Sequence, residues 1–118
     1  MKNSRAELGL WGEETACDYM LGRGARLLRR NFRSRSGEID LIFEDQECLV
    51  FLEVRTRKAS DFLDPLESID ARKQKKIRST ASLYYNKIWK QDSICRFDVI
   101  AIIGEPGNYK LNHIEDAF

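Results

Sequence analysis

Two segments of the chain place apolar residues at the three- and four-residue intervals of an amphipathic helix. In residues 5–22 the recurring positions are Leu8, Trp11, Thr15, Ala16 and Tyr19. Ser4 and Glu7 open this segment in the S-x-x-E order of a capping box. The second segment runs from Ala71 to about Trp89 and places on one face Ile77, Ala81, Tyr84, Tyr85 and Ile88. The periodicity therefore predicts two helices.

Strand-like patterns fill most of the remaining chain. Residues 37–57 alternate between apolar and polar on both sides of a polar turn, which is the pattern of a β-hairpin, and residues 25–33 form a further candidate strand. After a loop at 58–70 and the second helix, residues 95–103 are apolar at both parities, as in a strand buried on both faces. A short last strand is expected at 109–115. The predicted order is helix, three strands, helix, two strands, an α/β arrangement.

Length and composition restrict the class of protein. The chain has 118 residues, 42% apolar and 33% charged, so residues 1–118 are expected to form one globular domain. The longest apolar runs, 48–52 and 99–103, are far shorter than the ~20 residues that span a bilayer, so no membrane association is expected. The three cysteines are widely spaced, and the first residues lack an apolar signal segment. A cytoplasmic protein with reduced thiols is therefore expected.

The predicted hairpin brings two carboxylates together. If Gln46 and Glu47 are the central residues of the turn, Asp40 and Glu53 lie directly opposite each other, with Cβ atoms ~5 Å apart. Because side chains alternate with period two, three more charged residues share their face, namely Glu38, Arg55 and Arg57. The other face carries Ile39, Leu41 and Phe43 against Val50, Leu52 and Val54.

Two adjacent carboxylates repel each other, and a cation offsets this repulsion. Mg²⁺ prefers hard oxygen ligands, commonly one or two protein carboxylates, with water and substrate phosphate completing its shell. Such an ion can polarise a phosphodiester and lower the pKa of an attacking water. The alternative is that Asp40 and Glu53 lie on the solvent-exposed face of an ordinary hairpin, since their spacing is a loose pattern.

The sequence around this pair resembles a known family. The central block of the YraN-like family, small bacterial proteins of the PD-(D/E)XK superfamily, is similar to residues 37–42 (GEIDLI) and 49–57 (LVFLEVRTR). Its N-terminal GxxGExxA helix resembles residues 9–16 (GLWGEETA), and its basic second helix resembles 72–76 (RKQKK). Its closing segments are similar to 96–99 (RFDV) and 113–118 (HIEDAF). The resemblance therefore covers nearly the whole chain.

The resemblance implies a restriction-endonuclease-like fold, a central mixed sheet flanked by helices, close to that of archaeal Holliday-junction resolvases. It implies Mg²⁺ or Mn²⁺ as cofactor, bound by Asp40, by Glu53 as the first residue of the (D/E)XK motif, and by the carbonyl of Val54. It also implies that the first helix brings Glu13 to the catalytic site, although helical spacing alone does not separate Glu13 from Glu14. DNA, duplex or branched, is the implied substrate, and a two-fold homodimer is the implied assembly.

Arg55 departs from this motif, which has lysine at the corresponding position. Arginine stays protonated in proteins, so it can bind phosphate in a bidentate manner but cannot accept a proton. Lys73 or Lys76 could supply a displaced ammonium instead. Phosphate binding is therefore better supported than hydrolysis.

The near-neutral sum of 20 basic and 19 acidic residues conceals three blocks of like charge. Residues 23–36 hold six arginines and no acid, residues 38–53 six acids and no base, and residues 71–91 seven bases and no acid. Either basic stretch alone is more often a solvated surface, but together they predict a positive rim for a phosphate backbone. The candidate nucleic-acid-binding residues are Arg29, Arg30, Arg33, Arg35, Arg57, Arg72, Lys73, Lys75 and Lys76. The sequence shows no aromatic stacking series, which favours duplex or branched DNA over single strands.

Three hypotheses remain open. The leading one is a metal-dependent nuclease-like protein in which Asp40 and Glu53 hold Mg²⁺ or Mn²⁺, Glu13 assists, and Arg55 clamps the phosphate. The second is a DNA-binding module of the same fold that has lost hydrolysis through Arg55. The third is a partner-binding protein without nucleic-acid activity, whose acidic hairpin is only a solvated surface.

Overall fold

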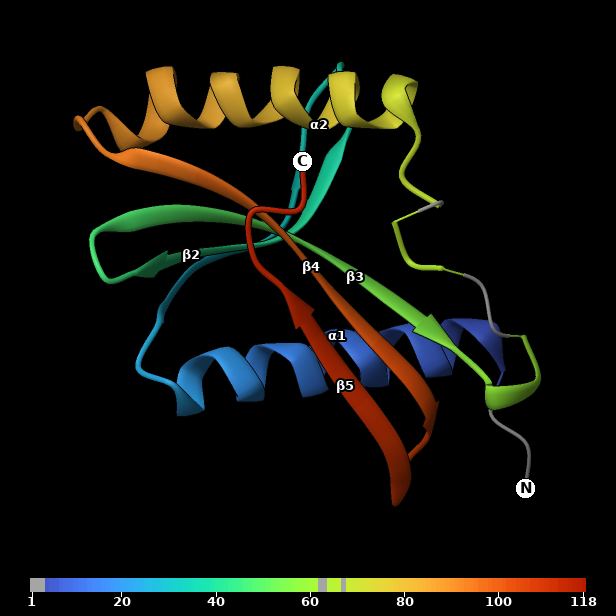
Figure 1. Ribbon diagram of the computed structural model, residues 1–118. Helices are drawn as coiled ribbons and strands as arrows, with labels where there is room; N and C mark the ends of the chain where they lie inside the picture. The colour runs from blue at the N-terminus through green and yellow to red at the C-terminus, as the bar shows by residue number, and fades with distance from the viewer. Residues whose placement is uncertain (1–3, 62–63, 67) are drawn as a thin grey trace.

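The computed structural model describes residues 4–61, 64–66 and 68–118 (Figure 1). The elements are, in chain order, α1 (Arg5–Gly22), β1 (Arg26–Arg33), β2 (Glu38–Asp45), β3 (Cys48–Arg57), the short 3₁₀ helix η1 (Ala59–Asp61), α2 (Ala71–Tyr84), the π-helical turn η2 (Tyr85–Trp89), β4 (Ile94–Glu105) and β5 (Asn108–Ile114). The predicted helices and strands are confirmed. Of the predicted loop 58–70, residues 62–63 and 67 lie outside the described residues. No helix in the described part of the chain is both long and apolar enough to cross a lipid bilayer.

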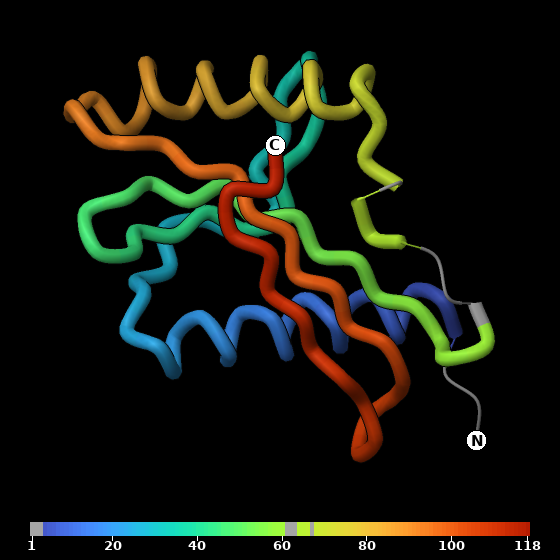
Figure 2. Tube along the Cα trace, in the orientation of Figure 1, coloured from blue at the N-terminus to red at the C-terminus, as the bar shows by residue number. Residues whose placement is uncertain are grey.

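The five strands form one mixed sheet in the order β1-β2-β3-β4-β5. β3 and β4 run parallel, and the other neighbouring strands are antiparallel. Because a tight turn cannot join parallel strands, the chain crosses from β3 to β4 through α2. Figure 2 follows this crossover along the chain, and Figure 1 shows the two helices on opposite sides of the sheet. The predicted central mixed sheet flanked by helices is thus confirmed.

Both faces of the β2–β3 hairpin are covered by apolar side chains. The cluster on the α1 side contains Leu41, Phe43, Val50, Leu52, Val54, Ala16, Cys17 and Met20. The cluster on the α2 side contains Ile42, Leu49, Phe51, Ile77, Ala81 and Tyr84. β3 is buried without interruption from Leu49 to Val54. Glu53 therefore does not lie on an ordinary solvent-exposed hairpin face, and Asp40 is half-buried.

Ile39 packs on the face opposite to the predicted one. It joins the α2-side cluster together with Phe32, its pairing partner in β1, whereas Leu41 lies on the α1 side. The change of face coincides with Asn31 of β1, whose φ of 49° lies in the left-handed region that asparagine adopts more readily than most residues. The break in alternation places Asp40 at the point where β2 changes face.

Helix α1 lies close against β3 at Gly12. A Cβ added to Gly12 would lie 1.9 Å from Oγ1 of Thr56 and 3.0 Å from its Cβ. Threonine is branched at Cβ and its side chain cannot swing far aside. The missing side chain of Gly12 therefore allows the helix to lie against β3 and to carry Glu13 to the end of the strand. Around Gly9, in contrast, nothing lies within 4 Å of such a Cβ.

A buried carboxylate in β4 fixes the C-terminal segment. Asp98 accepts hydrogen bonds from Nε and Nη2 of Arg96, both at 2.9 Å, and from the backbone N of Asp116 at 3.0 Å. Its Oδ2 lies 2.8 Å from Nε2 of His113. Burial alone would raise the pKa of Asp98, but these hydrogen bonds hold it below its usual range. His113 accordingly has a structural role.

We predict that Gly12→Ala destabilises the protein by about 1–3 kcal/mol, the usual cost of overpacking, because α1 must move away from Thr56. Gly9→Ala in the same helix is the matched control and should leave stability unchanged or raise it by up to about 1 kcal/mol. Urea unfolding measures both. The double change Gly12→Ala with Thr56→Ala should recover part of the loss, and additive effects of the two changes would contradict the close contact.

Candidate active site

Asp40 in β2 reaches across to the end of β3. The β2–β3 ladder has the predicted register and extends to the pair Leu41–Leu52, so Asp40 and Glu53 come next in that register. At this point a side chain takes part in the strand pairing: Oδ2 of Asp40 accepts a hydrogen bond of 2.8 Å from the backbone N of Val54. This contact anchors the Asp40 carboxylate beside Glu53 and Val54.

Glu53 is a nearly inaccessible carboxylate, with 3% of the residue exposed. Burial and the negative charge of Asp40 raise the pKa of Glu53 to about 8, against the opposing charges of Arg55 and Lys73. Its Oε1 is a buried atom without a hydrogen-bond partner among the described residues. The carboxylate pair is thus incompletely neutralised by the protein and favours a bound proton or a cation.

Glu13 lies on α1, at the Asp40 side of the pair. Burial and the charge of Asp40 raise the pKa of Glu13, and the charge of Glu38 acts in the same direction. A hydrogen bond with the Asn31 side chain and the charge of Arg30 oppose the shift. The structure therefore brings Glu13 to Asp40, as the resemblance implies.

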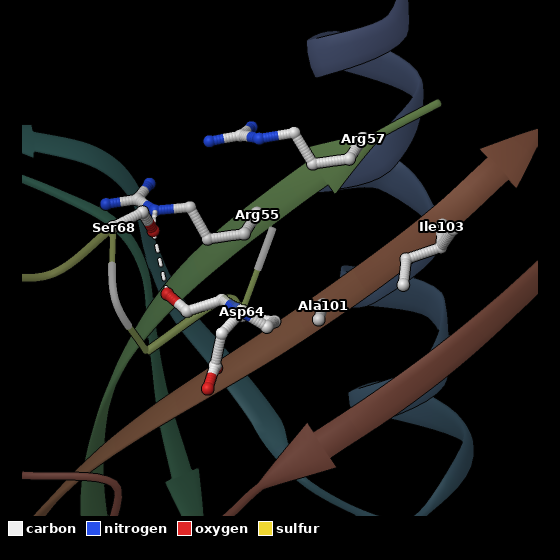
Figure 3. A pocket seen from close by; sticks show the side chains of 7 residues that line it. Arg55, Arg57, Asp64, Ser68, Ala101 and Ile103 are labelled. Carbon is white, nitrogen blue, oxygen red and sulfur yellow. Dashed lines mark hydrogen bonds between the residues drawn. The ribbon is translucent and has the colours of Figure 1, made fainter. Parts of the chain in front are cut away.

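Arg55 lies on the other side of Glu53, held by three neighbours. Its Nε donates a hydrogen bond of 2.9 Å to Oγ of Ser68, and its Nη1 donates one of 3.3 Å to the carbonyl of Val54. The same Nη1 lies 3.7 Å from Oε2 of Glu53, and the side chains of Arg55 and Glu53 are only 12% and 4% exposed. Figure 3 shows the guanidinium beside Ser68, with Arg57 extending from β3 in the same direction.

An open cleft of about 900 Å³ runs past these groups. Its lining includes Glu13, Asp40 and Val54 together with the basic side chains of Arg5, Arg55, Arg57 and Lys58. A second, much smaller cavity of about 10 Å³ lies behind Arg55 and Arg57, against Ser68 and Ala101 (Figure 3). Its volume suits about one water molecule, so of these two spaces the large cleft is the one that can admit a substrate.

The predicted basic rim is concentrated on α2 and at the cleft. The first turns of α2 expose Arg72, Lys73, Lys75 and Lys76, and the charge of Lys73 acts on Glu53. The turn between β1 and β2 packs against the same helix, because Oγ of Ser34 lies 3.1 Å from Oγ1 of Thr80. This turn contains the exposed Arg35, which therefore lies near α2.

The arginines of β1 are largely engaged by other groups. Arg30 forms an ion pair of 2.6 Å with Glu14, and Arg33 one of 3.4 Å with Glu38. The guanidinium of Arg29 lies 5.4 Å from the ring centre of Phe32. The sequence predicted phosphate-binding arginines here because the stretch itself contains no acid. The partners come instead from α1, from β2 and from the strand's own aromatic residue.

The oxygen atoms at the site fit a hard divalent ion. Asp40 and Glu53 could supply two carboxylates and Val54 a carbonyl oxygen, and Oε1 of Glu53 is without a hydrogen-bond partner in the described part of the chain. Among the described residues, no three His, Cys, Asp or Glu side chains converge to hold a metal by themselves. Mg²⁺ commonly has one or two protein carboxylates and takes water and phosphate for the rest. Glu13 would then lie beside the ion's position without binding it.

Sequence reasoning missed three residues near the carboxylates. Arg5 and Lys58 line the cleft, and Ser68 binds Arg55. Arg5 shares the four-residue spacing of Gly9 and Glu13, so the helical face of α1 could have indicated it. Ser68 lies in the crossover segment, where no periodicity relates it to β3.

The mixed sheet between two helices is consistent with a restriction-endonuclease-like fold, and comparison with known proteins identifies the family. Residues 12–102 match the Uncharacterised protein family UPF0102. The chain is 42% identical to a UPF0102 protein of Syntrophomonas wolfei over 95% of this chain and 97% of that protein. It is also 42% identical to one of Pelotomaculum thermopropionicum over the full length of both. A third, from Thermodesulfovibrio yellowstonii, is 43% identical over 98% of each chain. The chain belongs to the UPF0102 family, the YraN-like group.

We predict that metal-free protein loses stability as the pH rises from about 5 to about 8, and that Glu53→Gln removes this loss. The unfolded chain releases the Glu53 proton near the ordinary glutamate pKa of 4.5, whereas the folded chain keeps it up to about 8. The folded state therefore binds more protons in this window, and unfolding becomes easier with pH, by at most about 1.4 kcal/mol per pH unit.

Urea unfolding in the presence of a chelator, at several pH values in this window, measures the effect. Glu47→Gln is the matched control, since Glu47 is exposed in the turn of the same hairpin. Parallel stability profiles for Glu53→Gln and wild type would contradict the burial of an ionisable pair.

Proposed function

We propose that this protein is a Mg²⁺- or Mn²⁺-dependent nuclease that hydrolyses phosphodiester bonds in DNA, with duplex or branched DNA as the substrate. The observation that carries the proposal is that Asp40, which lines a cleft whose other charged residues are mostly basic, lies beside the buried Glu53. A negative centre suits a metal ion, and a basic lining suits phosphates. The family resemblance to PD-(D/E)XK proteins supports the same assignment.

The residues of the site would have distinct parts in this reaction. Asp40, Glu53 and the carbonyl of Val54 would hold the ion, which supplies Lewis-acid polarisation of the phosphodiester. Arg55 presents a planar guanidinium that can bind two phosphate oxygens. Burial and the charge of Asp40 raise the pKa of Glu13, so its carboxylate holds a proton more readily than that of an exposed glutamate.

The charge distribution on α2 supports an anionic ligand. Its first turn has no acid, and four basic residues follow within its first two turns. The N-terminus of a helix carries a partial positive charge, so basic side chains there are unfavourable for the helix itself. Asp70, the N-cap, offsets this in part, since its side chain accepts a hydrogen bond of 2.9 Å from the backbone N of Lys73. Contact with a phosphate backbone would compensate the remaining repulsion.

A second candidate function rests on Arg55. Its guanidinium occupies the position of the motif lysine and is bound by Ser68 and Val54. Because arginine stays protonated, it can bind phosphate but cannot take a proton from water. A DNA-binding module of the same fold, without hydrolysis, is consistent with this arrangement.

We predict that Asp40→Asn and Glu53→Gln each lower cleavage by about a hundredfold or more, the scale seen when one stabilising electrostatic group is removed. DNA affinity in the presence of a chelator should change by less than about threefold, because the basic residues remain. The assay compares linear, nicked and four-way-junction DNA with Mg²⁺ and with Mn²⁺.

Glu47→Gln, at the turn end of the same hairpin, is the matched control and should cleave at the wild-type rate. Cleavage that survives Asp40→Asn would contradict the proposed site. Wild-type protein that binds DNA with a steep salt dependence but cleaves none of the three substrates would favour the DNA-binding module.

We predict that Arg55→Lys lowers cleavage by about tenfold, because an ammonium cannot bind phosphate in a bidentate manner as a guanidinium can. Single-turnover cleavage of the preferred DNA substrate measures the change. Arg57→Lys is the comparison variant, because it makes the same change at the other arginine of β3 that lines the cleft. A higher rate in Arg55→Lys would instead indicate that the wild-type site is impaired by its arginine.

A further inference from the structure

We propose that Arg55 acts as an internal counter-ion that occupies the place of the divalent ion, so that binding of the ion displaces the arginine into the DNA cleft. The inference rests on the proposed function, because it concerns the same carboxylates. Two contacts carry it. Nη1 of Arg55 lies 3.7 Å from Oε2 of Glu53 and donates a hydrogen bond of 3.3 Å to the carbonyl of Val54. Two of the three groups that would bind the ion are therefore in contact with Nη1.

Burial makes this competition strong. The side chains of Arg55 and Glu53 are 12% and 4% exposed, so water screens little of the charge between them. A guanidinium and a divalent cation repel each other, and the carbonyl of Val54 cannot serve both in the same direction. The guanidinium of Arg55 therefore has to move away from Glu53 before an ion can bind there.

Ser68 holds the arginine in the blocking position. Its Oγ accepts the 2.9 Å hydrogen bond from Nε of Arg55 and donates one of 2.7 Å to the carbonyl of Pro65. The hydroxyl is thus oriented by the crossover segment, and the guanidinium is fixed at Nε while Nη1 rests against Glu53 and Val54. Ser68 is a positioning residue, since it reaches the carboxylates only through Arg55.

Displacement has a direction, because Arg55 already lines the cleft that contains Asp40 and Glu13. A guanidinium released from Glu53 enters the group of cations formed there by Arg5, Arg57 and Lys58. The ion and a phosphate backbone would then assist each other's binding. Binding of the ion frees the guanidinium of Arg55 to bind a phosphate, and the phosphate keeps the guanidinium in the cleft. By linkage, each increases the affinity of the other by the same factor.

Arg57 provides a comparison on the same strand. Its Nη1 donates a hydrogen bond of 2.8 Å to the carbonyl of Thr56, which is not among the proposed ligands. It lines the same cleft. Loss of Arg57 removes a positive charge near the site without vacating the position of the ion.

The test is calorimetric titration of the full chain with Mn²⁺ in the absence of DNA, for wild type, Arg55→Gln, Arg57→Gln and Ser68→Ala. Arg55→Gln should bind Mn²⁺ about tenfold more tightly or better, as expected when a screened unit charge is removed from beside the ligands. Ser68→Ala keeps every charge and should still tighten binding, by about threefold, since it loosens one hydrogen bond to a charged group. Arg57→Gln should change the affinity by less than about twofold.

Unchanged Mn²⁺ affinity in both Arg55→Gln and Ser68→Ala would overturn the inference and leave the proposed nuclease untouched. Equal gains from Arg55→Gln and Arg57→Gln, with none from Ser68→Ala, would also overturn it, since they would indicate general electrostatics. Tighter Mn²⁺ binding by both Arg55→Gln and Ser68→Ala, in a protein that cleaves no DNA, would support the counter-ion role while the nuclease proposal fails. If Arg55→Gln does not fold, the Ser68→Ala titration decides.

Discussion

The site is organised by one constraint, the placement of a carboxylate inside a strand that is buried on both faces. β3 is buried from Leu49 to Val54. All of these residues are apolar except Glu53, which is only 3% exposed. A charge in such a position is costly unless a partner compensates it. The protein supplies a second acid, Asp40, which increases the cost, and among the described residues Glu53 forms one ion pair, with Arg55 at 3.7 Å. In the proposed function, this unfavourable balance of charge is what would favour the binding of a further cation.

The fold positions every component of this balance through the backbone of β3. The pairing of β2 with β3 brings Asp40 to the amide of Val54, and the close approach of α1 at Gly12 brings Glu13 to the same end of the strand. The parallel crossover from β3 to β4 requires a long connection over the other face, and this connection carries Ser68 and the basic start of α2. The groups that we propose as proton acceptor, metal ligands and phosphate ligands thus come from four different elements.

Much of this could be predicted from local sequence patterns. Hydrophobic periodicity is set by burial of one or both faces, so it indicated the helices, the strands and the register that aligns Asp40 with Glu53. The face taken by Ile39 could not be predicted, because it depends on the left-handed backbone of Asn31 in the neighbouring strand. The ion pairs of the β1 arginines likewise depend on α1 and β2, and the tether of Arg55 depends on a loop hydroxyl. Such contacts join segments whose spacing in the sequence has no fixed period.

The structure also gives a physical reason for arginine at position 55. A lysine ammonium is a compact point charge, whereas a guanidinium offers donors in a fixed fork. Arg55 uses that fork to reach the hydroxyl of Ser68 from Nε and both Val54 and Glu53 from Nη1. A lysine could neutralise Glu53 but could not hold all three contacts at once. The departure from the motif and the loop serine therefore belong to one arrangement, in which a cation that stays protonated is held beside the buried carboxylate.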